Sequence, residues 1–418
     1  MASAVTGPSR RTRFLILADT HGAYYLPDTK ELQPIDVVIH CGDITADSQL
    51  SEYKTAIHLL SQIDAPLKLV IAGNHDFTLD TPTYKRMLHK ARRCRNFSEL
   101  LRTHGQPGDA RSFFEHARRP PQGDEEQQQQ QRDSVDINAD DAHHHHSSNN
   151  NNNDNNKATG IHYLDEGTYR FRLANSTTLT VYASPYTPAY GTPGFQYPAA
   201  RPGPESGKEG GAHEFSVPDD ADVVITHGPP HGVLDRSWAP PALLSIGGGG
   251  GGGAGRSRHV GSTELFTAVA RARPRMHCFG HIHEGWGAEV VRWGKPPELE
   301  NEERHGGSRS QRGGSGSGSG LGSTVIADLG SVLPLKGDSP EVVAEKEGRL
   351  REYAAGKCVK TSHCAGDALP VEKGENTLFV NAAVAGQPVQ PAWVVDLELP
   401  VAADDDARFS SDGQNYDQ

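Results

Sequence analysis

Short clusters of histidine, aspartate and asparagine recur along this 418-residue chain. Seven of these side chains have types that bind metal ions: Asp19, His21, Asp43, Asn74, His227, His281 and His283. A mixed oxygen and nitrogen set without thiolate suits borderline or hard divalent cations such as Mn, Fe or Zn. Because one catalytic ion keeps an open position, seven ligands are too many for it. The set therefore predicts two ions, with one carboxylate shared between them.

Each cluster follows a short apolar run that is typical of a buried strand. The runs cover 13–18, 36–40, 67–72, 221–226 and 276–279. Helical periodicity at 51–63 and 263–273 separates some of them, and 168–184 and 377–398 alternate apolar and polar residues like further strands. Buried strands with intervening helices indicate an α/β fold. Since ligands bind at the carboxyl ends of strands in such sheets, we expect the clusters to converge there.

Much of the chain has a composition that does not favour a packed core. Hydrophobic residues make up 35% of it, against roughly 45–50% in ordinary globular chains. Four polar or glycine-rich segments carry little apolar surface, namely 101–158, 199–215, 245–258 and 297–322. We therefore expect one domain over 13–400, interrupted by these disordered insertions, with disordered tails at 1–12 and 402–418. The histidine run His143–His146 lies inside the first insertion and is expected to be part of it.

Composition also argues against several classes of protein. The chain has no run of about 20 apolar residues and no apolar stretch typical of a signal peptide near its start. Its five cysteines are too few, and odd in number, for a disulfide framework. The net charge of −12, with no broad basic block, argues against nucleic-acid binding. We expect an intracellular, cytoplasmic protein with reduced thiols and with neither a membrane nor a nucleic acid as partner.

Five blocks in order carry a family resemblance. They are Asp19-Thr20-His21, Gly42-Asp43, Gly73-Asn74-His75-Asp76, Thr226-His227-Gly228-Pro229 and Gly280-His281-Ile282-His283. Together they resemble the blocks of the calcineurin-like metallophosphoesterases. The wider strings ITHGPPHGVLD, PRMHCFGHIHEGWG and TLFVNAAV are similar to the metallophosphoesterase-domain-containing subgroup, which has relatives among class III cyclic-nucleotide phosphodiesterases. The fold implied is a sandwich of two mixed β-sheets flanked by helices.

The resemblance also implies a role for each residue. Asp19, His21 and His283 would hold the first metal ion, Asn74, His227 and His281 the second, and Asp43 would bridge the two. A metal-bridging hydroxide would attack phosphorus. His75 would protonate the leaving oxygen or stabilise charge in the transition state. The implied activity is that of a metal-dependent phosphoric ester hydrolase.

The second block departs from the protein-phosphatase branch, because the residues after Asp43 lack the Asp-Arg-Gly of that branch. We therefore expect a small phosphodiester or phosphomonoester as substrate, with a cyclic-nucleotide-like compound suggested by the resemblance. One alternative is a regulatory or interaction module that binds metal and nucleotide with weak or no turnover. Another is a nuclease, against which the lack of a basic stripe counts.

Several further residues allow two interpretations. His231 and Asp76 are candidates for substrate contact, and Asp76 could also orient His75. Packing or structural roles are favoured for the remaining positions near the blocks, which are His40, Cys41, His277, Cys278, Trp286 and Asn381. The oligomeric state, the native metals and the substrate are left open by the sequence.

Overall fold

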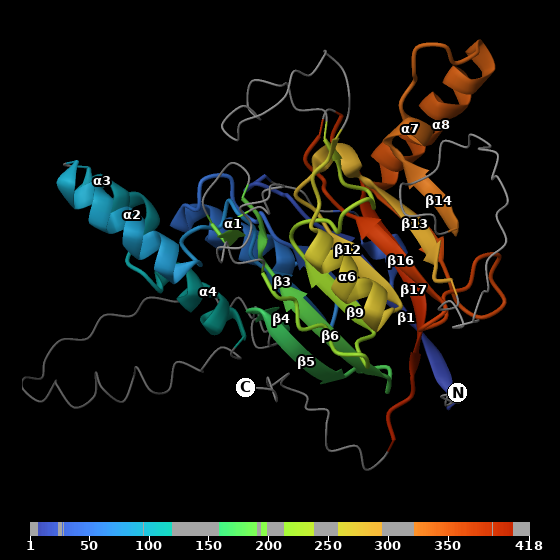
Figure 1. The fold of residues 1–418 in the computed structure, drawn as a ribbon, viewed down its shortest axis with the longest axis horizontal. Helices are drawn as coiled ribbons and strands as arrows, with labels where there is room; N and C mark the ends of the chain where they lie inside the picture. Colours follow the sequence, from blue (N-terminus) through green and yellow to red (C-terminus); the bar gives the residue numbers. More distant parts are fainter. Residues whose placement is uncertain are drawn as a thin grey trace, which may run out of the picture.

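The computed structural model describes residues 7–23, 27, 29–94, 96–118, 159–189, 194–198, 213–237, 258–294, 322–386 and 388–403. Two mixed sheets carry the described fold, with helices packed beside them (Figure 1). One sheet has six strands in the order β15-β17-β1-β2-β3-β4, and the other has seven in the order β14-β13-β16-β12-β9-β6-β5. This architecture confirms the predicted α/β sandwich.

The six-stranded sheet is parallel from β1 to β4. Its strands are β1 (Ser9–Leu17), β2 (Val37–Cys41), β3 (Leu67–Ile71), β4 (Ile161–Tyr163), β15 (Cys358–Ser362) and β17 (Ala392–Pro400). Strand β17 pairs antiparallel with β1, and β15 pairs parallel with β17 at the edge. The ends of β1, β2 and β3 therefore lie side by side.

The seven-stranded sheet has a parallel centre formed by β6, β9, β12 and β16. Its strands are β5 (Gly167–Arg172), β6 (Thr178–Ser184), β9 (Val223–Thr226), β12 (Met276–Phe279), β13 (Gly287–Arg292), β14 (Gly322–Asp328) and β16 (Asn376–Asn381). Short two-stranded pairs are formed by β7 (Thr187–Pro188) with β8 (Gln196–Tyr197), and by β10 (Arg236–Ser237) with β11 (Arg258–His259).

The helices pack on the outer faces of the sheets or extend from them. They are α1 (Leu50–Ser61), α2 (Thr81–Arg93), α3 (Phe97–His104), α4 (Asp109–Arg118), α6 (Thr263–Ala272), α7 (Leu329–Val332) and α8 (Pro340–Gly356), with short 3-10 turns η1 (Lys30–Leu32) and η2 (His283–Gly285). In Figure 1, α2 and α3 extend on one side and α7 and α8 project on the other. None of the helices among the described residues has the length and apolar character to cross a bilayer.

The main core lies between the two sheets. Phe14 and Ile16 of β1 belong to the same buried cluster as Val181 of β6 and Val223 of β9. Cys41 and Cys278 are also fully buried in this cluster, which confirms that their side chains face the core. All five cysteines are free thiols, as expected. A second cluster packs α1 and α4 on the outer face of the six-stranded sheet, and a third packs α6 on the other sheet.

Most elements expected from the sequence are present within a few residues of their predicted bounds. The five apolar runs correspond to β1, β2, β3, β9 and β12, and the two periodic segments to α1 and α6. The alternating segments 168–184 and 377–398 each contain a pair of strands, β5 with β6 and β16 with β17. One tail was placed wrongly: β1 begins at Ser9, inside the tail predicted for 1–12, and pairs there with β17.

The first predicted insertion, 101–158, is wrong at its start. Helix α3 continues through His104, and α4 follows as an amphipathic helix. Ala110 and Phe114, one turn apart on α4, are buried against α1 and β4. Two apolar side chains one turn apart are a weak indication of a helix in the sequence, because the segment that follows is rich in glutamine, histidine and asparagine. The part of the prediction at 119–158 lies outside the described residues, as do most of the other three insertions.

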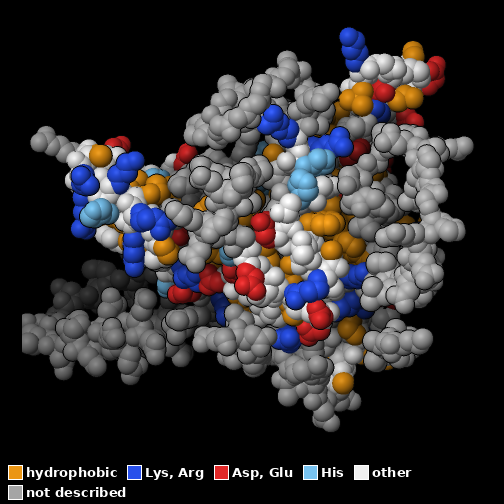
Figure 2. All heavy atoms as spheres, in the orientation of Figure 1, with side chains coloured by type: hydrophobic (Ala, Val, Ile, Leu, Met, Phe, Trp, Pro, Cys, Tyr) orange, Lys and Arg blue, Asp and Glu red, His pale blue; other side chains and the backbone are white. Residues whose placement is uncertain are grey.

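Helix α2 carries a cluster of basic side chains that the sequence analysis did not single out. Its buried face is formed by Tyr84, Leu88 and Ala91. The exposed side carries Lys85, Arg86, Lys90, Arg92 and Arg93. Figure 2 shows blue side chains gathered over α2 and α3. The negative net charge of the chain thus coexists with a local positive surface.

The burial of Phe114 leads to a stability prediction. Its ring is 2% exposed and lies 6.1 Å from the ring of Tyr53 and 5.2 Å from that of Tyr163, centroid to centroid. Because truncation would leave a cavity in this cluster, we expect Phe114→Ala to lower the free energy of unfolding by about 3–5 kcal/mol. The exposed neighbour serves as control, with Glu115→Ala changing it by less than about 0.5 kcal/mol. Urea denaturation followed by circular dichroism measures both, and equal effects would contradict the packing role of α4.

Candidate metal centre

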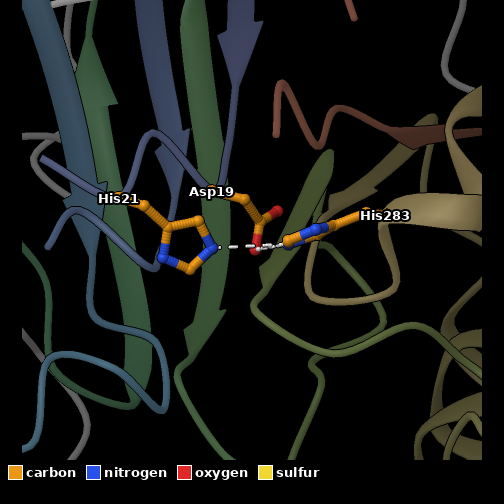
Figure 3. Close-up of side chains that lie close together, drawn as sticks. All are labelled: Asp19, His21 and His283. Carbon is orange, nitrogen blue, oxygen red and sulfur yellow. Dashed lines mark hydrogen bonds and ion pairs between the residues drawn. The ribbon is translucent and has the colours of Figure 1, made fainter. Parts of the chain in front are cut away.

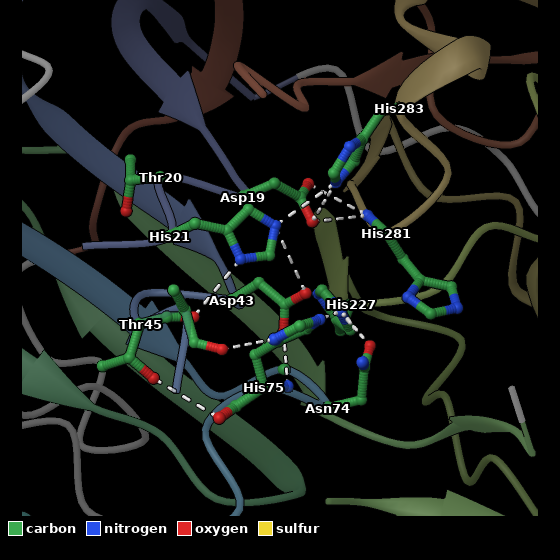
Figure 4. Close-up of polar contacts among 12 residues, drawn as sticks. Asp19, Thr20, His21, Asp43, Thr45, Asn74, His75, His227, His281 and His283 are labelled. Carbon is green, nitrogen blue, oxygen red and sulfur yellow. Dashed lines mark hydrogen bonds and ion pairs between the residues drawn. The ribbon is translucent and has the colours of Figure 1, made fainter. Parts of the chain in front are cut away.

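The seven candidate ligands and His75 come together at one place, where the ends of five strands meet (Figure 4). The six-stranded sheet supplies Asp19 and His21 after β1, Asp43 after β2, and Asn74 and His75 after β3. The seven-stranded sheet supplies His227 after β9, and His281 and His283 after β12. The site therefore lies across the two sheets, as the convergence of strand ends predicts.

One end of the site is formed by Asp19, His21 and His283 (Figure 3). The Nε2 atoms of His21 and His283 are 3.4 Å apart, and His283 Nε2 is 3.4 Å from Asp19 Oδ1. Asp19 is fully buried, whereas the two imidazoles are partly exposed. Three donor atoms this close together can hold a single cation between them.

The other end is formed by Asp43, Asn74, His227 and His281. His227 Nε2 lies 3.0 Å from Asn74 Oδ1 and 3.3 Å from Asp43 Oδ1. Donor atoms of Asp43, His227 and His281 lie within 4.8 Å of one another. His281 follows β12 as His283 does, and Asp43 follows β2, which pairs with the β1 strand before Asp19, so the two groups are adjacent.

Asp43 has the position of a bridge between the two groups. Its Oδ2 is 3.8 Å from His21 Nε2, and its Oδ1 is 3.3 Å from His227 Nε2. The two oxygens of one carboxylate thus face different groups of imidazoles. This arrangement fits the expectation that one carboxylate is shared by two ions, and the oxygen and nitrogen donors are the types that divalent cations of this kind prefer.

Backbone carbonyls fix the orientation of two imidazoles. His227 Nδ1 donates to the carbonyl oxygen of Cys41 at 2.9 Å, and His21 Nδ1 lies 3.3 Å from that of Thr45. A proton held at Nδ1 leaves Nε2 as the ligand atom in the neutral ring. In both residues Nε2 is the nitrogen that faces the carboxylates. The sequence carried no signal for these partners, because any residue type supplies a carbonyl.

The buried carboxylates and the imidazoles change one another's pKa. Burial opposes ionisation of Asp43, but the charge and hydrogen bond of His227, together with the charges of the neighbouring imidazoles, outweigh it, so the pKa of Asp43 is lowered. Burial likewise disfavours the imidazolium of His227, yet Asp43 raises its pKa to about 9. Burial lowers the pKa of His281 to about 3, so that this ring is neutral. The buried carboxylates thus favour positive charge at this site, which suits divalent cations.

The backbone adopts uncommon conformations at several of these positions. Asp19, His21, Asp43 and His281 all have positive φ, between 47° and 69°. For residues other than glycine this left-handed region costs free energy, and such conformations concentrate at functional sites. Close approach adds a second constraint, since a Cβ on Gly73 would collide with the carboxylate of Asp43. Backbone strain at these positions thus accompanies the close approach of the side chains.

His75 lies at the edge of the same site. Its ring centroid is 4.7 Å from that of His21, and its backbone N–H donates to Asp43 Oδ1 at 2.8 Å. Its Nδ1 lies 2.6 Å from the carbonyl oxygen of Ala46. That carbonyl orients the imidazole, which is the role that the sequence analysis considered for Asp76.

The placement of Asp76 does not fit the predicted contact with substrate or the orienting of His75. Its carboxylate is fully buried and accepts backbone N–H groups of Ile44, Thr45 and Gly73 at 2.8–3.0 Å. It also accepts the hydroxyl of Thr45 at 2.7 Å. Asp76 therefore ties the loop after β2 to the loop after β3.

The other candidate near the site, His231, lies apart from the ligand groups. Its ring is 5.5 Å from that of His259, and its Nδ1 is 3.8 Å from Asp235 Oδ2. Half of its side chain is exposed. Contact with substrate remains a proposal for this residue, whose backbone N–H donates to the carbonyl of Ser262 at 2.8 Å.

The residues expected to have packing or structural roles are buried and hydrogen-bonded to other parts of the fold. His40 and His277 are buried, and each accepts or donates a hydrogen bond with a threonine hydroxyl, Thr20 at 3.0 Å and Thr226 at 2.8 Å. Trp286 is 1% exposed, stacks on Trp393 and donates to the carbonyl of Pro391. Asn381 Nδ2 donates to the carbonyls of Ile282 and Leu234, so it braces the turn that carries His283.

Comparison with known proteins gives a consistent result. The profile of the family described as calcineurin-like phosphoesterase matches residues 12–183, which include Asp19, His21, Asp43 and Asn74. Metallophosphoesterase domain-containing protein 1 of Homo sapiens is 27% identical over 281 residues, which are 67% of this chain and 63% of the relative. The protein of the same name from Mus musculus gives the same values.

Two further matches carry less information. A protein from Emericella nidulans named "Probable rhamnogalacturonate lyase C" is 27% identical over 284 residues, 67% of this chain but only 18% of that protein. A solved crystal structure aligns over 67% of this chain and 86% of its own with 12% identity and a TM-score of 0.31, too low to bear on the fold. The chain thus spans less than two thirds of the length of these curated relatives.

The shared position of Asp43 leads to a prediction on metal binding. We expect the chain, after treatment with a chelator, to bind two Mn²⁺ ions, and Asp43→Asn to weaken binding of both because both groups use its carboxylate. The expected loss is about 100-fold or more, above the 10–100-fold that loss of an outer partner costs. Titration calorimetry with elemental analysis measures it, with the exposed Asp47→Asn as control. Unchanged binding by Asp43→Asn would contradict the bridging position.

Proposed function

Because the chain belongs to the calcineurin-like metallophosphoesterase superfamily, we propose that it hydrolyses a small phosphoester with the help of two divalent metal ions. Membership of this superfamily implies metal-dependent phosphoester hydrolysis. The observation that carries the proposal for this chain is the convergence of all seven candidate ligands from both sheets. Ligands lost from either sheet would have favoured a binding module instead.

We assign the residues as follows. Asp19, His21 and His283 hold one ion, and Asn74, His227 and His281 hold the other, with Asp43 shared. When bound, two such ions supply a water of lowered pKa as nucleophile and neutralise charge on the phosphate oxygens. The carboxylates of Asp19 and Asp43 would offset part of the charge of the ions, and the carbonyls of Cys41 and Thr45 hold two of the imidazoles in place.

His75 is the group we assign to the leaving oxygen. In the imidazolium form both ring nitrogens carry protons, and the one at Nδ1 is directed to the carbonyl of Ala46. The proton at Nε2 is then the one that passes to the oxygen of the departing group. The backbone N–H bond to Asp43 keeps the residue in fixed relation to the shared carboxylate.

The substrate is proposed only as a class. A small phosphodiester or phosphomonoester fits the absence of the protein-phosphatase sequence after Asp43, and a cyclic nucleotide is one member of this class. The name of the human relative mentions a metallophosphoesterase domain and no substrate. A panel of esters therefore has to decide between monoester and diester.

Hydrolysis assays test the proposal. We expect turnover of p-nitrophenyl phosphate, bis(p-nitrophenyl) phosphate, or cyclic AMP or GMP with Mn²⁺ and none with chelator. His75→Ala should lower kcat by about 10²–10⁴-fold, the usual contribution of a general acid. Asp43→Asn should abolish turnover, and Asp47→Asn should keep it.

One outcome would contradict the proposed hydrolase activity. If the chain binds two ions and a nucleotide but hydrolyses none of these esters above the His75→Ala level, the site serves binding without catalysis. That outcome would favour the alternative function, a module that binds metal and nucleotide. Turnover that survives in His75→Ala would keep the hydrolase and remove His75 from its assigned role.

A further inference from the structure

A cavity of about 780 Å³ opens directly beside the candidate metal centre. Asp19 and His21 line it, together with side chains of α8. We call it the α8 cavity, the space bounded by His21, Tyr353 and Val389. Its volume lies within the roughly 300–1,000 Å³ of small-molecule sites in proteins. A ligand with its phosphate at the metal centre would therefore have room for an organic group here.

Helix α8 supplies an apolar wall that is fixed to the rest of the fold. Leu350 and Tyr353 line the cavity and also pack against the core between the sheets. Arg349, the residue before Leu350, donates to the carbonyl of Ser331 on α7 at 3.3 Å. The Ser339 side chain caps the first turn of α8. The wall is thus a helix that is capped at its first turn and joined to α7 by a hydrogen bond near its middle.

The connection between β16 and β17 supplies a further part of the lining, which is also largely apolar. Val384, Pro388 and Val389 line the cavity. Val389 is 66% exposed, more than the other exposed large apolar side chains of the described residues. An apolar group of a ligand would cover this side chain and remove it from water.

This connection is joined by hydrogen bonds to the backbone of the metal centre. The backbone N–H of Val384 donates to the carbonyl of Ala18, the residue before Asp19, at 2.9 Å. The side-chain amide of Gln390 donates to the backbone carbonyl of His283 at 3.1 Å. The cavity wall therefore has a fixed position relative to two candidate ligands.

We propose that the α8 cavity binds the organic group of the phosphoester and favours esters of flat, apolar groups such as aromatic rings. The inference rests on the proposed function, because the phosphate is taken to lie at the metal centre. Tyr353 offers a ring for stacking, and Leu350 and Val389 offer apolar contacts. Arg351 and Lys357 at the same cavity favour ligands that carry negative charge.

Phosphonates test this proposal without turnover, because their carbon–phosphorus bond is not an ester. Titration calorimetry of the Mn²⁺-loaded protein compares phenylphosphonate with methylphosphonate, which share the phosphonate group and differ in the organic group. We expect the wild-type chain to bind phenylphosphonate about 10–100-fold more tightly, the gain typical of burying one aromatic ring.

Two variants test whether the preference for phenylphosphonate arises in the α8 cavity. Tyr353→Ser should bring the ratio of the two dissociation constants close to one while leaving methylphosphonate binding unchanged. Since Tyr353 also packs against the core, Val389→Ser provides a second variant at an exposed position, with an expected several-fold lower ratio. Glu352→Ala, an exposed neighbour on α8 that does not line the cavity, should keep the wild-type ratio. Circular dichroism checks that each variant is folded.

The outcomes separate this inference from the proposed function. Equal affinity of the wild-type chain for both phosphonates would overturn it, and so would a ratio that neither Tyr353→Ser nor Val389→Ser lowers. Either result is compatible with ester hydrolysis at the metal centre. A preference for phenylphosphonate that depends on both residues, in a chain without turnover, would support the cavity and refute the hydrolase.

Discussion

The arrangement of this protein depends on placing two carboxylates, Asp19 and Asp43, side by side away from water. Both are almost completely buried, and an isolated buried carboxylate is very costly. Each therefore has an imidazole partner, His283 for Asp19 and His227 for Asp43. Each also accepts a backbone N–H, that of His281 for Asp19 and that of His75 for Asp43. These interactions join one sheet to the other at the point where their strands end. A pair of divalent ions would supply more positive charge at the same place, which is why the site fits metal so well.

The surroundings keep further charge out of this region. His40 and His277 lie behind the centre, each hydrogen-bonded to a threonine that directly precedes or lies within a ligand block. Burial lowers their pKa to about 4 and about 3, so both rings are neutral at physiological pH. His40 lies on β2 beside β1 in one sheet, and His277 lies on β12 beside β9 in the other. The neutral histidines thus support the strand ends without competing with the metal ions for the carboxylates.

The strand ends are predictable because buried strands and metal ligands both have distinctive local patterns in the amino-acid sequence. The runs before Asp19, Asp43 and His281 are apolar enough to be recognised alone. The role of Asp76 was not accessible, because a carboxylate that caps backbone N–H groups looks the same in sequence as one that meets solvent. The carbonyls of Ala46 and Cys41 left no signal at all. Helix α4 was not predicted from the sequence, because it adjoins a polar segment and only two of its residues, Ala110 and Phe114, are buried.

The α8 cavity shows why the chemistry and the selectivity of such a site have different origins. The ligand groups are held by strand ends whose positions are set by sheet pairing, so they tolerate little change. The cavity walls come from α8 and from the connection that contains Val389, which lie outside the pairing of the sheets. Hydrogen bonds to Ala18 and His283 nevertheless fix one wall to the centre. Side chains on these walls can therefore vary the organic group that is accepted, while the distance between that group and the phosphate stays constant.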